Sequence, residues 1–167
     1  MARATATPGV GLQFIVDQIG ELYGLEQVIV RVEQDFASRT NLADVRTHLE
    51  RFVSEDQQHS ENLLQVLRMM LGTETTVQTA IDRGRGLGDA ILQASQDSAY
   101  SFVRALMLLV YQASQAGRNF IQVQQRIDNR EIIGLLETNF YQDGAHLRYL
   151  EAQVTRAAEE LSGLVGR

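Results

Sequence analysis

The sequence predicts an all-α protein, and within that class an antiparallel four-helix bundle. Three observations lead to this prediction. Pro8 is the only proline in the chain, and proline is the residue that most strongly interrupts helices. Apolar residues recur at steps of three and four over long segments, whereas the alternation typical of strands is scarce. A segment with little periodicity, residues 73–86, divides the helical pattern into two halves, as expected for two helical hairpins.

The length of 167 residues suits one domain. We expect a flexible N-terminal tail at residues 1–8 and a single four-helix-bundle domain at residues 9–167. The chain has no cysteine, which excludes disulfides and thiolate metal sites. It also opens without the basic and apolar leader typical of secreted proteins. The expected location is therefore the cytoplasm.

Charge and hydropathy narrow the range of partners. The net charge is -6 and the basic residues are scattered arginines, which disfavours binding to the phosphate backbone of nucleic acids. The longest apolar run, Ala105 to Tyr111, is far shorter than the roughly 20 residues that a membrane-spanning helix needs. We therefore expect neither a nucleic-acid partner nor a membrane partner.

The first helix is expected at about residues 9–37, because one stripe of side chains recurs there at helical spacing. Glu26 and Glu33 interrupt this otherwise apolar stripe. Glu33 lies near the expected end of the helix, so we expect it to be solvated. The stripe consists of Leu12, Ile15, Ile19, Leu22, Glu26, Ile29, Glu33 and Phe36.

The second helix is expected to begin after an N-cap at Asn41 and to stop at Gly72, a residue type common just after helices. Asp56 and His59 occupy positions where its periodicity calls for apolar residues. His48 lies off this stripe, so we expect it at the surface. The stripe is Leu42, Val45, Leu49, Phe52, Asp56, His59, Leu63, Val66 and Met70.

The third helix is expected to begin near Asp89, and two stripes on it are equally periodic. One is Leu92, Gln96, Ala99, Val103, Leu106, Val110 and Ala113, and the other is Ile91, Ser98, Phe102, Leu109 and Ala116. The sequence leaves open which stripe faces the core. It also leaves open whether the helix ends at Gly117 or continues through Ile127.

The fourth helix is expected to begin after Asp128 and Asn129, since Glu131 stands three residues after Asp128 in a capping-box arrangement. It should run to about Leu161. Asp143 lies on its core stripe and His146 lies at the edge. The stripe is Leu136, Phe140, Asp143, Leu147, Leu150, Val154, Ala157 and Leu161.

Two Asp-x-x-His pairs therefore occupy core-facing positions. Asp56 precedes His59 by three residues, as Asp143 precedes His146, and residues three apart share one face of a helix. The second pair follows the first at an offset of 87 residues, which is suggestive of a duplicated hairpin. A buried ionisable side chain is costly unless it is paired, hydrogen-bonded or bound to a metal. Two such pairs indicate a shared polar site.

The turn between the first two helices brings a further carboxylate to this site. Glu26 lies about as far before that turn as Asp56 lies after it, so the two should meet at mid-bundle. Carboxylate oxygen with imidazole nitrogen suits iron, manganese or zinc. The alternative is a hydrogen-bonded or ion-paired network between helices without metal. Both interpretations stay open at this point.

Three short segments of the chain, residues 21–27, 97–106 and 135–138, resemble the ferritin-like superfamily, in particular YciE/YciF-type bacterial stress proteins. Residues 21–27 resemble the opening helix of those proteins, residues 97–106 resemble the third, and residues 135–138 resemble the fourth. Ferritin-like bundles carry Glu on helices 1 and 3 and Glu-x-x-His on helices 2 and 4, around two metals. Carried over by position, the resemblance implies metal ligands at Glu26, Asp56, His59, Gln96 or Asp97, Asp143 and His146.

The function that this resemblance implies is binding and oxidation of Fe(II), in stress protection or metal handling, with iron or manganese as the metal. The chain departs from the family pattern, because Asp replaces Glu in both pairs and Gln96 stands nearest to the place of the helix-3 glutamate. The centre is accordingly complete with two metals, reduced to one, or lost. The alternative function is a metal-free helical scaffold or interaction protein with a degenerate ferritin-like core.

A second apolar row accompanies the core stripe of the first helix. Val16, Tyr23 and Val30 recur there at steps of seven residues. An apolar row beside the core stripe suggests a partner helix. We therefore expect a homodimer that uses the first helix as part of its interface.

Overall fold

The computed structural model describes residues 10–40, 42–71, 77–93, 99–126 and 130–165. Within these ranges the chain forms helices and no strand, so the all-α prediction is confirmed for this part of the chain. The predicted tail at residues 1–8 lies outside the described residues. The helices are α1 (Val10–Arg39), α2 (Ala43–Leu71), α3 (Gln78–Gln93), α4 (Ala99–Arg126) and α5 (Arg130–Val165). None of these helices is both long and apolar enough to cross a membrane.

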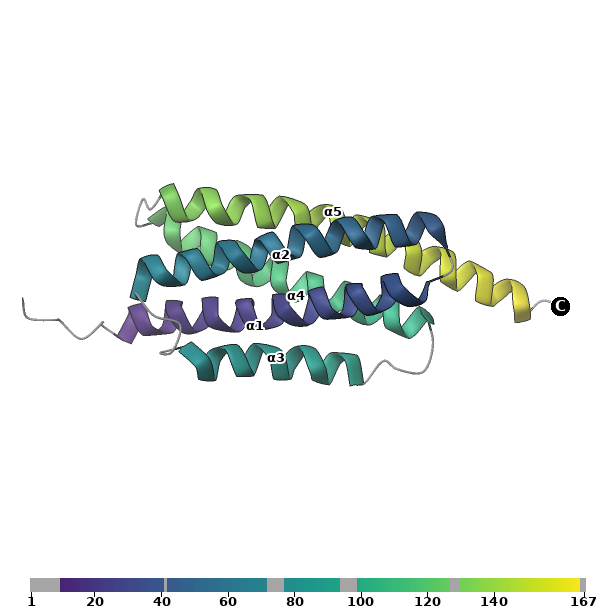
Figure 1. Cartoon of the computed structure of the whole chain (residues 1–167), viewed down its shortest axis with the longest axis horizontal. Coiled ribbons are helices and arrows are strands. Elements are labelled where there is room, and N and C mark those ends of the chain that lie inside the picture. The colour runs from purple at the N-terminus through teal and green to yellow at the C-terminus, as the bar shows by residue number, and fades with distance from the viewer. Residues whose placement is uncertain (1–9, 41, 72–76, 94–98, 127–129, 166–167) are drawn as a thin grey trace, which may run out of the picture.

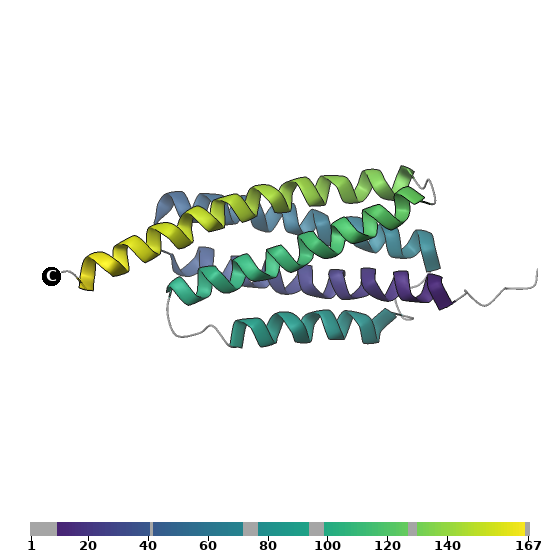
Figure 2. The same cartoon turned by 180° about the vertical axis from the view of Figure 1, so that it is seen from behind.

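The four longer helices lie side by side, and the shorter α3 lies along the outer side of α1 (Figure 1). α1 packs against α2, α3 and α4, while α5 packs against α4 and α2. The view from behind shows α4 and α5 crossing the face opposite to α2 and α1 (Figure 2). α1, α2 and α5 consequently surround a common interior.

α4 resolves the two questions that the sequence leaves open. It continues through Gly117 to Arg126, and a Cβ built at Gly117 would meet no atom within 4 Å, so this glycine does not end the helix. On α4 the first of the two candidate stripes faces the core, because Val103, Leu106, Val110 and Ala113 are buried. Leu109 of the second stripe is buried as well, whereas Ala116 is only partly buried.

The segment that precedes α4 differs from the prediction. We expected residues 73–86 to form a connection and the third helix to begin near Asp89, and both expectations are wrong, since residues 78–93 form α3 and α4 begins at Ala99. Gly84, one of the glycines that indicate a loop, is instead a packing residue. A Cβ at Gly84 would lie 1.9 Å from the carbonyl oxygen of Glu21, and a Cβ at Gly24 would lie 2.1 Å from that of Ile81. The backbones of α1 and α3 approach so closely that no side chain fits between them.

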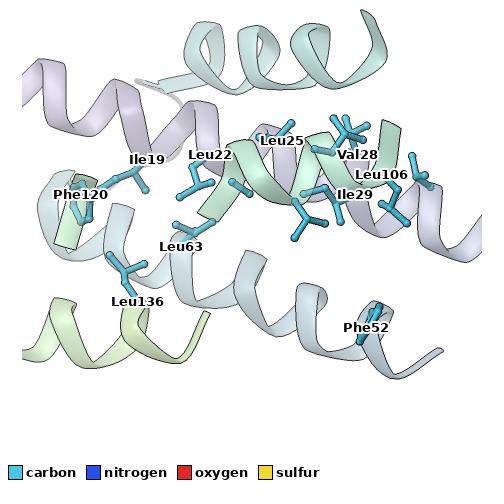
Figure 3. Packing of buried hydrophobic residues seen from close by; sticks show 14 of the residues in the cluster. Ile19, Leu22, Leu25, Val28, Ile29, Phe52, Leu63, Leu106, Phe120 and Leu136 are labelled. Atoms are coloured by element: carbon cyan, nitrogen blue, oxygen red, sulfur yellow. The ribbon is translucent and has the colours of Figure 1, made fainter. Parts of the chain in front are cut away.

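An apolar core runs along the interior of the helices (Figure 3). Many of its members come from the predicted stripes, but Leu25, Val28 and Leu67 are buried as well and lie on none of them. The largest buried side chains include Phe52, Ile29 and Leu106. The second row on α1 is partly covered by the chain itself. Val16 is fully buried and Tyr23 packs partly buried against the core, so Val16 does not contribute to an interface with a second copy.

Candidate metal centre

Within the part of the chain that the structure describes, six ionisable side chains interrupt the apolar core, and each is at most 4% exposed. α1 contributes two of them, because Glu26 and Glu33 are seven residues apart and therefore share one helix face. α2 and α5 each contribute one Asp-x-x-His pair. The six are Glu26, Glu33, Asp56, His59, Asp143 and His146.

The six residues form two groups of three, in each of which the ligand atoms lie within 4.8 Å of one another. Triad A consists of Glu26, His59 and Asp143, and triad B consists of Glu33, Asp56 and His146. Each triad takes one residue from α1, one from α2 and one from α5. Each also combines the aspartate of one Asp-x-x-His pair with the histidine of the other.

Asp56 joins the two triads. Its Oδ1 lies 3.1 Å from Nδ1 of His59 and 3.4 Å from Nδ1 of His146. Nδ1 of His59 also lies 3.3 Å from Oδ1 of Asp143 and 3.9 Å from Oε1 of Glu26. Both imidazole rings thus turn Nδ1 toward the carboxylates.

The opposite ring nitrogens are held by two residues outside the triads. Nε2 of His59 lies 2.9 Å from Oε1 of Gln142, and Nε2 of His146 lies 2.6 Å from Oε2 of Glu55. Both partners accept hydrogen bonds through oxygen, so each Nε2 carries the proton and donates. In a neutral ring this arrangement leaves the lone pair on Nδ1, where it can bind a metal. Metal-binding histidines usually donate a hydrogen bond from the other ring nitrogen in this way.

Packing and backbone contacts fix these rings further. The rings of Phe52 and His146 have centroids 3.8 Å apart, and those of His59 and His146 are 6.2 Å apart with an interplanar angle of 18°. Nδ2 of Asn139 donates to the carbonyl oxygen of His59, and Nδ2 of Asn62 donates to Asn139. These bonds tie α2 to α5 beside the cluster, so the site is held by rigid helices rather than loops.

Burial dominates the electrostatics of the acids. Burial raises the pKa of Glu26 and that of Glu33 well above the ordinary value, and the charges of Asp143 and Asp56 respectively raise them further. Burial also raises the pKa of Asp143, although the hydrogen bond and charge of His59 oppose this effect.

His59 shows the complementary effect. Burial alone would lower its pKa, but its contacts with Asp143 and Asp56 and the charge of Glu26 outweigh that effect and raise the pKa to about 11. The metal-free cluster therefore holds protons that a bound cation would displace.

The donor atoms fit divalent metal ions. Among the described residues, seven buried atoms of this cluster that could bind a metal form no hydrogen bond of good geometry, although some, such as Nδ1 of His59 and Oδ1 of Asp56, lie close to an oppositely charged atom. The seven are Oε2 of Glu26, both carboxylate oxygens of Glu33 and Asp56, and Nδ1 of His59 and His146. An unsatisfied buried polar group typically costs about 1–3 kcal/mol. The four carboxylates, when ionised, also match the charge of two divalent cations. Both observations agree with one ion for each triad.

Five of the seven predicted ligand residues meet in this cluster, namely Glu26, Asp56, His59, Asp143 and His146. Gln96 and Asp97 lie outside the described residues. The prediction that Glu33 is solvated is wrong, since this side chain is 0% exposed.

α4 contains no Asp or Glu between residues 99 and 126. Ala113 precedes the link to α5 by about as many residues as separate that link from Asp143, so α4 presents an apolar side chain at this level. α1 supplies the additional glutamate instead.

Glu55 and Gln142 were not anticipated from the sequence. Each directly precedes the aspartate of an Asp-x-x-His pair, and the two are 87 residues apart, so the offset between the pairs could have identified them. His48 is partly buried rather than fully at the surface, and its ring stacks on that of Tyr149 at a centroid distance of 4.3 Å.

No protein-family model matches the sequence, and no curated protein matches it significantly. A solved structure does match the fold: the crystal structure of ferritin-like, diiron-carboxylate proteins from Bacillus anthracis strain Ames. The identity is 13%, the match covers 87% of this chain and 99% of that chain, and the TM-score is 0.70. At this identity the likeness shows the fold, which is ferritin-like.

Proposed function

We propose that this chain is a ferritin-like dimetal-carboxylate protein in which α1, α2, α4 and α5 form an antiparallel four-helix bundle around two ions of iron or manganese. Triad A and triad B would each hold one ion, with Asp56 between them. The observation that carries the proposal is the convergence on one buried cluster of two triads of metal-binding side chains, seven atoms of which form no hydrogen bond of good geometry. The diiron-carboxylate character of the structural neighbour supports the same chemistry.

The residues have separate tasks in this proposal. The carboxylates bind the ions and neutralise their charge, and the surrounding apolar core excludes bulk water. The histidines complete the coordination through Nδ1, while Gln142 and Glu55 hold the rings in place. When bound, iron would supply the electrons for reducing oxygen or peroxide as Fe(II) is oxidised. A role in stress protection or metal handling in the bacterial cytoplasm is part of the proposal.

The test is metal stoichiometry on the purified full chain. Elemental analysis after equilibration with Mn(II), followed by removal of free metal, should give two ions per chain in the parent. Asp56→Asn should bind fewer ions, because Asp56 contacts both triads, whereas Glu50→Gln, which changes an exposed carboxylate on α2, should still bind two. Oxidation of added Fe(II) by oxygen, followed by absorbance, should be faster with the parent than with Asp56→Asn. Equal metal content in the parent and Asp56→Asn would contradict the proposed site.

A metal-free helical scaffold is the second candidate, and two observations favour it. α4 lacks the carboxylate that ferritin-like bundles place on their third helix, and His59 already has carboxylate oxygens at 3.1 and 3.3 Å. Under this alternative the parent would bind neither Fe(II) nor Mn(II), and its melting temperature would not respond to either metal.

We also propose that the protein is a homodimer that uses α1 as part of its interface. Tyr23 and Val30 on the second row of α1 are partly exposed, so they remain available to a second copy. Static light scattering of the full chain should give twice the monomer mass. A monomer mass over the micromolar range would contradict the dimer.

A further inference from the structure

The two histidines of the cluster differ in the partner that holds them, and the inference drawn from this difference rests on the proposed function. Glu55 and Gln142 occupy equivalent positions, each one residue before the aspartate of an Asp-x-x-His pair. Each accepts a hydrogen bond from Nε2 of the histidine on the other helix. The two hydrogen bonds therefore have the same arrangement of helices and ring nitrogens, but the accepting groups of Glu55 and Gln142 differ chemically.

The acceptor of His146 is a carboxylate, whereas that of His59 is a neutral carboxamide. Hydrogen bonds to ionised acceptors are shorter and stronger than those to neutral ones, and the two distances, 2.6 Å to Glu55 and 2.9 Å to Gln142, follow that order. A carboxylate that accepts from one ring nitrogen increases the basicity of the other. Nδ1 of His146 should thus be the stronger donor to a metal ion.

Glu55 is also placed to keep this role without becoming a ligand itself. Its Oε2 is engaged by His146, and its Oε1 lies 3.6 Å from Nε of Arg51. Its side chain is 25% exposed, so its charge is partly solvated while the triads are buried. Gln142 cannot supply a charge at any pH. The cluster accordingly has one half supported by an anion and one half without such support.

We propose that Glu55 is a positioning residue that makes triad B the tighter of the two metal sites, so that the first ion binds at Glu33, Asp56 and His146. Changes to residues that hold metal-binding histidines typically alter metal affinity by 10- to 100-fold. The two sites should therefore differ by roughly 10-fold or more in Kd, with Glu55 responsible for the difference.

The repeat provides a matched set of variants, because each residue can be replaced by its counterpart. Calorimetric titration with Mn(II) is carried out on the parent, Glu55→Gln, Gln142→Glu and the double exchange. The parent should show two steps. Glu55→Gln should weaken the tighter step and Gln142→Glu should strengthen the weaker one. Each single variant should therefore narrow the gap, by which we mean the ratio of the two Kd values. The double exchange should restore it.

Repulsion between the two bound ions also separates the steps, but it is common to all four proteins, so the change in the gap is the informative quantity. Glu50→Gln removes the same charge from the exposed face of α2 and should leave the gap unchanged. Melting of the metal-free variants identifies a purely structural role, which would lower stability without changing the gap. Two bound ions with the same gap in the parent and Glu55→Gln would overturn this inference and leave the proposed function intact. A parent that binds no Mn(II) would overturn both.

Discussion

Replacing Glu33 by methionine is expected to stabilise the metal-free protein and to remove part of the stabilisation that metal confers. Glu33 is fully buried, and neither of its carboxylate oxygens has a hydrogen-bond partner. Methionine has a flexible, apolar side chain that adapts to the same space. Removing an unsatisfied buried polar group is worth about 1–3 kcal/mol. For a chain of this size, that corresponds to a rise of roughly 2–12 °C in melting temperature.

The assay is thermal unfolding followed by circular dichroism, first with a chelator and then with Mn(II) at a concentration 100 times the Kd of the weaker site. In the parent, the weaker site should add about 2.7 kcal/mol and a site that binds roughly 10-fold more tightly should add about 4.1 kcal/mol. Glu33→Met should lose the contribution of triad B and keep that of triad A. Glu50→Met, at an exposed position on α2, serves as the control and should change neither measurement. If Glu33→Met melts lower than the parent in chelator and gains as much from Mn(II), Glu33 is a structural residue and the reasoning fails.

Two further predictions follow from packing and charge. Gly84→Ala should strongly destabilise the chain or detach α3, because the added Cβ would lie 1.9 Å from a backbone oxygen of α1. Gly86→Ala should instead stabilise the chain by about 0.5–1 kcal/mol, because its Cβ would meet no atom within 4 Å. Urea unfolding of both variants checks this prediction, and equal effects on the two would contradict the close packing. The folded-state pKa is raised for Glu26, for Asp143 and for His59, which rises from 6.5 to about 11. A group whose pKa is higher in the folded state stabilises the protonated fold. The stabilisation from each of these three groups is therefore fully present below its unfolded-state pKa and is lost as the pH rises through its folded-state pKa, so the free energy of unfolding of the metal-free protein should fall between about pH 5 and pH 11. Urea unfolding in chelator tests the sign, and stability that rises over this interval would contradict it. Mn(II) affinity should rise over the same interval, since binding displaces these protons.

Helical periodicity accounts for much of what the sequence could predict. It selects the buried face of α1, including Ile19, Leu22 and both glutamates, and the spacing of the Asp-x-x-His pairs places them on core-facing stripes. Glu33 is buried although it lies near the end of the helix, because its position on the core stripe brings it against Asp56 of α2 and His146 of α5. α1 in fact continues to Arg39, which leaves Glu33 more than a turn inside the helix, where α2 and α5 cover it.

α3 could not be predicted in the same way, because glycines, which have no side chain, form much of the surface that packs against α1. Gly84 and Gly88 are four residues apart and face α1, but intrinsic propensity treats glycine as a helix breaker. The tertiary contacts of α3 with α1, which include those with Gly24, Glu21 and Val28, make the helix favourable. The roles of Glu55 and Gln142 likewise depend on the distance between α2 and α5, which no single-helix pattern contains.

The most direct test of the central claim is to locate metal ions in crystals of the full chain grown with Mn(II). An anomalous difference map recorded above the manganese absorption edge identifies the ions independently of any assumption about their ligands. We expect two peaks in the interior between His59 and His146, one bordered by triad A and the other by triad B. A map with no peak among these side chains, from crystals in which the cluster is otherwise well ordered, would contradict the account and favour the metal-free scaffold.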